Sequence, residues 1–195
     1  MRVDEAREFY NQVFSVADGF GVSYNWQDID AGSRNRNLTY GEIDFDGFLQ
    51  LLYEVPEITK RRVFYDLGSG VGKVVVAAAL LGNFIEVNGI EIVPPLHEQA
   101  VMAANHCRAL KNLPSINFFQ GDFLQGDYTR ADLVFTHSTC FSQSLMYALE
   151  EALSVLSPGV IVLTVSQSLP KMEIIKVQKY PFKWGLGTVY FHKKS

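Results

Sequence analysis

From residue 63 onward, short apolar runs alternate with longer stretches in which apolar residues recur every three or four positions. The short runs are typical of buried strands, and the periodic stretches are typical of helices that pack on one face. The runs predict strands at 63–67, 86–91, 116–120, 131–136 and 160–166. The periodic stretches predict helices at 71–81, 95–111 and 142–155. Because strands that alternate with helices form parallel sheets covered on both faces, the pattern predicts an α/β fold.

The last part of the chain differs, because two extended runs follow each other with no helical stretch between them. They cover residues 173–182 and 186–192 and are joined across Lys183, Trp184 and Gly185. Two such runs with a short connection predict an antiparallel hairpin. With the earlier strands, this hairpin predicts a Rossmann-like, seven-stranded, mostly parallel sheet that has helices on both faces and a C-terminal antiparallel hairpin.

The N-terminal segment predicts two helices that precede the sheet. Residues 4–17 alternate acidic and apolar positions as an amphipathic helix does, and the glycines between 19 and 32 predict a loop. Thr39 and Glu42 have the spacing of a capping box, and the apolar positions that follow predict a second helix ending before Pro56.

Length and composition favour a single compact unit. The chain has 195 residues, of which 48% are hydrophobic and 19% are charged. We expect a helical lid at 1–60 and a Rossmann-like core at 61–195, together forming one structural unit. No apolar run reaches the roughly 20 residues that a membrane-spanning helix needs, so we expect an intracellular protein of the cytoplasm or nucleus.

Charge and cysteine content exclude several classes of function. The net charge of −4 argues against strong sequence-independent binding to nucleic acid, where Lys and Arg neutralise phosphates. Cys107 and Cys140 are the two cysteines, and they lack the spacing of metal ligands. We therefore expect two free thiols and no metal site.

A glycine-rich turn follows the first core strand. Asp66 ends that strand, Gly68-Ser69-Gly70-Val71-Gly72 follows, and Lys73 begins an apolar helix. Glycines allow positive φ and a close approach of the backbone to a ligand, and a helix start presents unpaired N–H groups. Glu91 ends the next strand about 20 residues later, where an acid can bind ribose hydroxyls. The pattern predicts a nucleotide site.

Two common kinds of nucleotide turn do not match this run. A P-loop requires a glycine where Leu67 stands and a hydroxyl where Val74 stands. A dinucleotide fingerprint requires a third glycine where Lys73 stands. Asp66 would repel a phosphate but attract a cation. The turn therefore favours S-adenosyl-L-methionine, a sulfonium nucleoside with an amino-acid tail.

Four polar residues lie at or just after predicted strand ends, and we expect them to converge at the carboxyl edge of the sheet. Asp66 and Glu91 end the first two strands, while Asp122 and His137 follow the third and fourth. Glu91 offers two oxygens to a ribose diol, and Asp122 could accept from an adenine amine beside Phe123. An acid at a strand end is also often only a helix cap or a solvated loop residue.

Four successive motifs resemble those of the disruptor-of-telomeric-silencing histone lysine methyltransferases, the lysine methyltransferases without a SET domain. The motifs are Tyr40-Gly41-Glu42-Ile43, Asp66 to Gly72, Gly89-Ile90-Glu91 and Gly121-Asp122-Phe123, and the resemblance covers about residues 38–192. It implies that Tyr40 to Ile43 close over the methionine end of the cofactor, with Asp66 to Lys73 beneath. The expected cofactor-binding residues are Tyr40, Gly41, Glu42, Ile43, Asp66, Gly68, Ser69, Gly70, Gly72, Lys73, Glu91, Asp122 and Phe123.

The acceptor side departs from that family. Where the family carries paired asparagines and then aromatic residues, residues 136–141 read Thr-His-Ser-Thr-Cys-Phe, which keeps only the last aromatic. Val189 also stands beside Tyr190 where the family has an aromatic residue. We expect His137 and Tyr40 at the catalytic end, with His137 as a candidate base because imidazole titrates near neutral pH. A structural role for His137 stays open.

The leading hypothesis is an S-adenosyl-L-methionine-dependent methyltransferase that acts on a protein lysine, with a histone-type acceptor possible. A methyltransferase for a small molecule, and a cofactor-binding module that has lost catalysis, remain alternatives. A nicotinamide oxidoreductase is disfavoured by Lys73. We expect the partner to be a protein substrate or a small-molecule acceptor, and we expect no association with a membrane.

Overall fold

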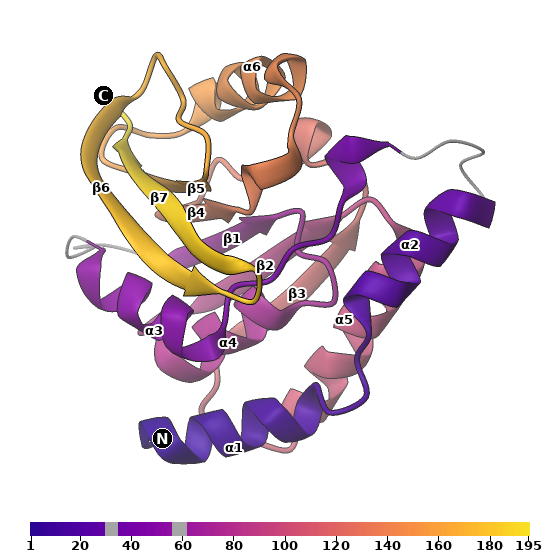
Figure 1. The fold of residues 1–195 in the computed structure, drawn as a ribbon. Coiled ribbons are helices and arrows are strands. Elements are labelled where there is room, and N and C mark those ends of the chain that lie inside the picture. The colour runs from indigo at the N-terminus through magenta and orange to yellow at the C-terminus, as the bar shows by residue number, and fades with distance from the viewer. Residues whose placement is uncertain (30–34, 56–61) are drawn as a thin grey trace.

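The computed structural model describes residues 1–29, 35–55 and 62–195. Among them, seven strands form one sheet in the order β3-β2-β1-β4-β5-β7-β6 (Figure 1). The strands are β1 Val63–Leu67, β2 Glu86–Glu91, β3 Ser115–Gln120, β4 Leu133–Thr136, β5 Ile161–Val165, β6 Glu173–Phe182 and β7 Gly185–Lys193. Strands β1 to β5 are parallel, and β7 is antiparallel to both β5 and β6. The predicted mostly parallel sheet with a terminal hairpin is confirmed.

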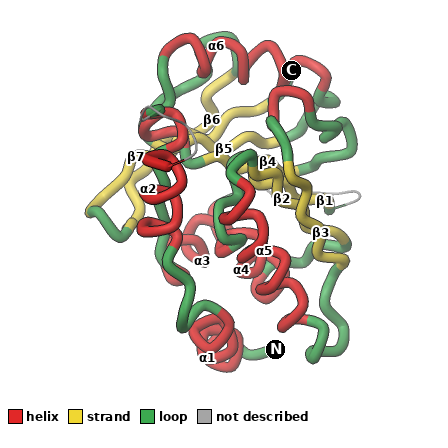
Figure 2. The backbone as a smooth tube through the Cα atoms, turned by 90° about the vertical axis from the view of Figure 1, so that its right-hand side faces the viewer, coloured by secondary structure: helices red, strands yellow, loops and turns green. Residues whose placement is uncertain are grey.

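Helices cover both faces of the sheet. They are α1 Val3–Val13, α2 Gly19–Ile29, α3 Phe45–Glu54, α4 Lys73–Leu81, α5 Pro94–Cys107 and α6 Gln143–Ala152, with short 3-10 turns η1 Arg36–Leu38, η2 Phe123–Gln125, η3 Ser138–Cys140 and η4 Leu153–Val155. Figure 2 shows the sheet between α6 on one side and α4 with α5 on the other. This is the layering expected for parallel strands joined by helices.

Alternate residues of the central strands β1, β4 and β5 feed two separate cores. Phe64 of β1 packs with α1, α3, α4 and α5, whereas its neighbours Val63 and Tyr65 pack with α6. All five residues of β1 are buried, as the continuous apolar run predicts. Helix α4 is buried from Val75 to Leu80, which confirms that a helix apolar nearly all round lies against the sheet.

The loop predicted between the glycines at 19 and 32 is wrong for its first part, because α2 occupies Gly19–Ile29. The described residues before β1 therefore form three α-helices, not two. Gly19 and Gly21 lie in the first turn, where Asp18 accepts a hydrogen bond from the Gly21 N–H at 2.9 Å and so caps the helix. Glycines at the start of a helix do not break the helix that follows them. Trp26 of α2 packs against the hydrophobic core.

The predicted capping box at Thr39 and Glu42 is also wrong. Helix α3 begins at Phe45 after Asp44, and Thr39 instead ends η1. The Glu42 side chain takes part in ion pairs described below. Pro56, Gly32 and the expected boundary at residues 60 and 61 lie outside the described residues.

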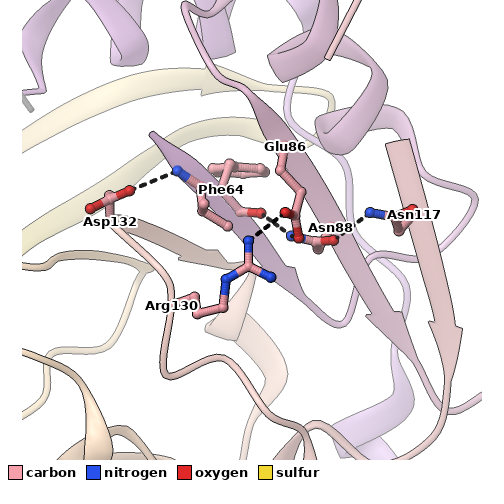
Figure 3. Close-up of polar contacts among 7 residues, drawn as sticks. Phe64, Glu86, Asn88, Asn117, Arg130 and Asp132 are labelled. Atoms are coloured by element: carbon pink, nitrogen blue, oxygen red, sulfur yellow. Dashed lines mark hydrogen bonds and ion pairs between the residues drawn. The ribbon is translucent and has the colours of Figure 1, made fainter. Parts of the chain in front are cut away.

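A buried polar network crosses the sheet (Figure 3). Asn88 of β2 is 0% exposed, and its amide donates to the Phe64 carbonyl at 3.3 Å and to Glu86 at 3.1 Å. Asn117 of β3 donates to the Asn88 oxygen at 3.0 Å. Arg130 closes the network by pairing with Glu86 at 2.8 Å. A buried amide is tolerated here because its donor and acceptor groups are satisfied.

The parts of the chain that the structure describes contain no helix long and apolar enough to cross a bilayer. Across those same residues, no three His, Cys, Asp or Glu side chains gather closely enough to hold a metal ion. Cys107 and Cys140 are free thiols, as expected.

Candidate functional site

The site forms where the strand order reverses. β1 has β2 on one side and β4 on the other, so the loops after β1 and β4 diverge at the carboxyl edge of the sheet. Such a switch point is where open α/β sheets bind ligands. The glycine turn follows β1 at this point, and His137 follows β4.

The glycine turn needs its glycines for different reasons. Gly68, Gly70 and Gly72 have φ of 85°, 55° and 85°, a region that favours glycine. A Cβ on Gly68 would meet nothing within 4 Å, so this residue faces open space. A Cβ on Gly70 would lie 2.3 Å from the Tyr40 ring, and one on Gly72 would lie 2.5 Å from Phe118. Gly68 therefore faces the cavity, whereas Gly70 and Gly72 allow close packing.

Glu91 holds the glycine turn in place. Its carboxylate accepts from the Gly70 N–H at 2.7 Å and from the Val93 N–H at 2.8 Å, and the residue is 6% exposed. Burial raises the pKa of the carboxyl, while the two N–H donors act against that rise. Each oxygen still has a second acceptor position, because a carboxylate offers about four. Glu91 can thus shape the turn and bind a ligand at the same time.

Asp66 is the second buried carboxyl at this edge. It is 2% exposed, and burial together with the nearby charge of Glu91 raises the pKa of Asp66 well above its usual value. The buried hydroxyl of Ser69 has no hydrogen-bond partner among the described residues. A positively charged donor in the cavity would stabilise the ionised form of Asp66.

A covering segment, residues 37–43, lies over the glycine turn, and two small neighbouring compartments lie beneath it. The first measures about 20 Å³ and the second about 60 Å³. The first is lined by Tyr40, Gly41, Glu42, Ile43, Asp66, Gly68, Ser69, Lys73, Val74, Phe135 and His137. The second is lined by residues 37–41, Leu67, Gly68, Glu91, Ile92, Val93, Leu96, Phe123, His137 and Phe141. Most of the residues predicted for the site thus line these two compartments, which share Tyr40, Gly41, Gly68 and His137.

Three of the predicted cofactor residues do not line these compartments. Gly70 and Gly72 lie behind the cavity wall in the packing roles described above. Asp122 caps η2, where its carboxylate accepts from the Leu124 N–H at 2.9 Å. The structure therefore shows Asp122 as a helix cap, which is the alternative role that the sequence left open for it.

Glu42 is the centre of a charged cluster. Its side chain is 2% exposed, accepts from the Tyr40 hydroxyl at 2.8 Å and pairs with Lys73 at 2.6 Å. Lys183, at the tip of the terminal hairpin, pairs with its other oxygen. Burial raises the pKa of Glu42, but Lys183, Lys73 and Tyr40 outweigh burial and lower it. Sequence analysis missed Lys183, since no motif surrounds it.

The Tyr40 hydroxyl stays neutral. Burial and the adjacent Glu42 raise its pKa well above the usual value for tyrosine. Its ring lines both compartments and meets Phe20 edge-on, with centroids 5.1 Å apart. Tyr40 is therefore a hydrogen-bond donor and an aromatic wall, not a general base.

His137 lies against an aromatic cluster formed by the hairpin tip. Its ring centroid is 5.3 Å from that of Phe182 and 6.3 Å from that of Trp184. The Trp184 indole N–H donates to His137 Nε2 at 3.4 Å. Burial lowers the pKa of His137 to about 4. Because indole only donates, Nε2 carries no proton, and the imidazole is neutral near pH 7.

Comparison with known families decides the identity. Residues 22–180 match the family described as histone methylation protein DOT1, and this match spans most of the chain. The chain belongs to the DOT1 family. As a DOT1 family member it is an S-adenosylmethionine-dependent methyltransferase, which confirms the family resemblance, the activity class and the cofactor inferred from the motifs. No curated protein sequence matches significantly.

Solved structures show the same fold for this DOT1 family member. An RNA methyltransferase from Salinibacter ruber, in complex with S-adenosyl-L-homocysteine, is 27% identical over 76% of this chain and 88% of its own, with a TM-score of 0.56. A magnesium protoporphyrin IX methyltransferase from Synechocystis PCC 6803 with bound S-adenosylmethionine is 13% identical, covers 92% of this chain and 99% of its own, and has a TM-score of 0.61. A putative class I methyltransferase from Listeria monocytogenes is 14% identical over 93% and 70%, at a TM-score of 0.61.

The donor set of the DOT1 family member suits the cofactor, but the cavity as observed is small. Asp66, Glu91 and the unpartnered Ser69 hydroxyl provide groups for a cation and for sugar hydroxyls. Compartments of about 20 and 60 Å³ fall below the roughly 300 Å³ at which ligand pockets begin. The residues that line these compartments must therefore rearrange to admit the cofactor.

Proposed function

We propose that this methyltransferase transfers a methyl group to the side-chain amine of a protein lysine, with histones as candidate acceptors. The observation that carries the proposal is the uncharged aromatic cluster of Phe182, Trp184 and neutral His137 next to the cofactor cavity. Aromatic faces hold an alkylammonium by cation–π attraction and pack its aliphatic stem. Family membership supports the same acceptor class.

We assign the cofactor to the two compartments. The nucleoside would lie in the compartment lined by Glu91 and Phe123, with Glu91 accepting from the ribose hydroxyls and Phe123 flanking the base. Asp122 is one residue away and would serve the adenine amine only after giving up its cap of η2. The amino-acid tail would lie in the compartment lined by Asp66 and Lys73.

The tail compartment would be completed by the covering segment and the glycine turn. Gly41 and Ile43 would close over it, with Gly68 and Ser69 beneath. Gly70 and Gly72 contribute indirectly, by letting Tyr40 and Phe118 pack behind the turn.

The residues around the reacting centre act mainly by alignment and exclusion of water. When bound, the cofactor supplies a methyl group on a positively charged sulfur. Holding the acceptor amine in line with that carbon can lower the activation free energy by roughly several kcal/mol. Tyr40 forms one wall, and the Trp184 N–H fixes the ring of His137. We place both Tyr40 and His137 at this catalytic end.

His137 is poorly suited to remove the proton of a lysine ammonium. With its pKa at about 4, it binds a proton far more weakly than an amine does. We therefore propose that His137 positions the acceptor, and that the ammonium proton leaves to water before attack. Replacement of the family's asparagines by His137 is compatible with that role, since a neutral imidazole does not repel the incoming cation.

A labelling experiment tests the acceptor. The protein is incubated with S-adenosylmethionine labelled on the methyl group, together with histones, nucleosomes, total cell protein or total RNA. We expect label in lysine residues of a protein fraction, identified by mass spectrometry as methyl-lysine, and its loss in Glu91→Ala. Label in RNA alone would overturn the lysine proposal in favour of an RNA acceptor, the activity named for the 27%-identical relative. Label in no fraction, with the cofactor bound, would indicate a small-molecule acceptor or a lapsed enzyme.

A further inference from the structure

Two lysine ammonium groups share one buried carboxylate at the tail compartment. Lys73 Nζ lies 2.6 Å from Glu42 Oε1, and Lys183 pairs with Glu42 Oε2. The two ammonium groups are close enough that Lys183 lowers the pKa of Lys73, in addition to the larger effect of burial. This Glu42 cluster, consisting of Glu42, Lys73 and Lys183, carries one uncompensated positive charge.

The main chain holds Lys183 beside Glu42, a residue that lines the cavity. Its N–H donates to the Glu42 carbonyl at 3.3 Å, and the preceding Phe182 forms an antiparallel bridge with Ile43. The tip of the β6–β7 hairpin is therefore hydrogen-bonded to the covering segment. Figure 1 shows the hairpin tip beside the chain that leads into α3. Lys183 lies beside Glu42 because of this docking.

Asp66 adds a carboxyl group to the lining of the same compartment. It lines the cavity with Glu42 and Lys73, and its pKa is raised by burial and by Glu91. The compartment thus contains one carboxylate, Asp66, for which the described residues provide no ion pair, and beside it two lysines share the single carboxylate of Glu42. A zwitterionic amino-acid group matches both needs, with its ammonium at Asp66 and its carboxylate at the lysines.

We propose that Lys183 binds the carboxylate of the cofactor's amino-acid tail, so that the terminal hairpin completes the cofactor site. The inference rests on the assignment of the tail to this compartment in the proposed function. Lys73 supplies the cavity wall, and Lys183 supplies the second charge from a segment more than a hundred residues away in sequence. Binding of the tail is thereby linked to docking of the hairpin, which also carries Trp184.

A comparison of two ligands tests the proposal by calorimetry. S-adenosylhomocysteine has the amino-acid tail, whereas 5′-methylthioadenosine has the same nucleoside without it. We expect Lys183→Met to lower the affinity for S-adenosylhomocysteine by about tenfold, the usual effect of one charge-assisted hydrogen bond. The affinity for 5′-methylthioadenosine should change by less than about twofold. Lys179→Met is the matched control, because Lys179 is exposed on β6, the strand that leads into the turn of Lys183, and it should affect the binding of neither ligand.

The outcomes separate the inference from the function on which it rests. Equal weakening of both ligands by Lys183→Met, or no weakening, overturns the role of Lys183. Binding of neither ligand by the unmodified protein overturns the cofactor assignment itself. Retained 5′-methylthioadenosine binding shows that the variant is folded. If it does not fold, acetylation footprinting of the unmodified protein decides, because S-adenosylhomocysteine should protect Lys183 and 5′-methylthioadenosine should not; equal protection refutes the proposal.

Discussion

Two buried carboxyls at one sheet edge have different surroundings, and these surroundings set their tasks. Glu91 receives two main-chain N–H groups, which stabilise its ionised form. Asp66 has the higher cost of ionisation, because burial and the charge of Glu91 both raise its pKa. We infer that Glu91 is preformed as an acceptor, whereas Asp66 becomes fully ionised only with a cation nearby.

Glu91→Ala should lower both stability and cofactor affinity. The change leaves the buried N–H groups of Gly70 and Val93 without their partner, which costs about 1–3 kcal/mol in the free energy of unfolding. The loss of charged hydrogen bonds to the ribose should weaken the binding free energy of S-adenosylhomocysteine by about 1–3 kcal/mol. Urea unfolding and calorimetry measure the two effects. Glu98→Ala, on the exposed face of α5, is the control, and unchanged affinity in Glu91→Ala would remove Glu91 from the site.

At the scale of elements, the terminal hairpin depends on a buried histidine in β7. His192 is 0% exposed, and its Nε2 accepts from the Leu169 N–H at 3.4 Å and contacts the Thr164 hydroxyl at 3.2 Å. Burial lowers the pKa of His192 from 6.5 to about 4. The ring must stay neutral for Nε2 to accept, so the hairpin is anchored by an uncharged imidazole.

This histidine predicts acid sensitivity. Between pH 6.5 and about 4 the unfolded state binds more protons at His192 than the folded state does, so stability falls as pH falls through that window. The full effect is about 3 kcal/mol for His192 alone. Urea unfolding at pH 7, 5.5 and 4.5 should show this slope, and His192→Gln should reduce it. His106→Gln, at an exposed position of α5, should leave the dependence of stability on pH unchanged. The same pH dependence in both variants would contradict the assignment to His192.

The alternation of strands and helices was predictable from sequence because each of these elements is specified by its own periodicity. β1 and α4 are apolar enough to identify their buried positions without knowing any partner. Helix α2 as a whole was missed, because glycines in a first helical turn look the same as glycines in a loop. Glu42 was misread because its ionic partners, Lys73 and Lys183, lie on distant segments, and Lys183 reaches it only through docking of the hairpin. Contacts between distant segments have no local pattern.

The candidate site divides in the same way. The residues that line the cavity on the glycine turn and at the strand ends were predictable, since parallel strands bring their carboxyl ends to one edge. The pKa of His137 was not, because it depends on burial under Phe182 and Trp184 from the far end of the chain. The Asn88 network was missed for the same reason, since its partners lie on three other segments.

At the scale of the whole molecule, the N-terminal helices share a core with the sheet. Phe48 of α3 is 1% exposed and packs edge-on against Phe64 and Phe135, with ring centroids 6.1 and 5.9 Å apart. Phe14 lies just after α1, and the Nζ atom of Lys73 lies 5.8 Å from the centroid of its ring. The helices that close the site are thus built into the main hydrophobic core.

This shared core predicts one cooperative unfolding transition. The chain has two tryptophans, Trp26 in α2 and Trp184 in the hairpin. In Trp184→Phe the fluorescence reports α2, and in Trp26→Phe it reports the hairpin. In each variant the fluorescence midpoint in urea should coincide with the midpoint from far-ultraviolet circular dichroism. An earlier Trp26 transition would show that the N-terminal helices unfold as a separate unit.

During synthesis, β5 leaves the ribosome before the strand that will pair with it. β7 is inserted between β5 and β6, so until residues 185–193 emerge the nascent chain exposes the open edge of a fully buried apolar strand. Open edges of this kind attract other strands. Translation that pauses or stops ahead of β7 should therefore yield chains that aggregate or recruit chaperones, even though every earlier element of the sheet has already been made.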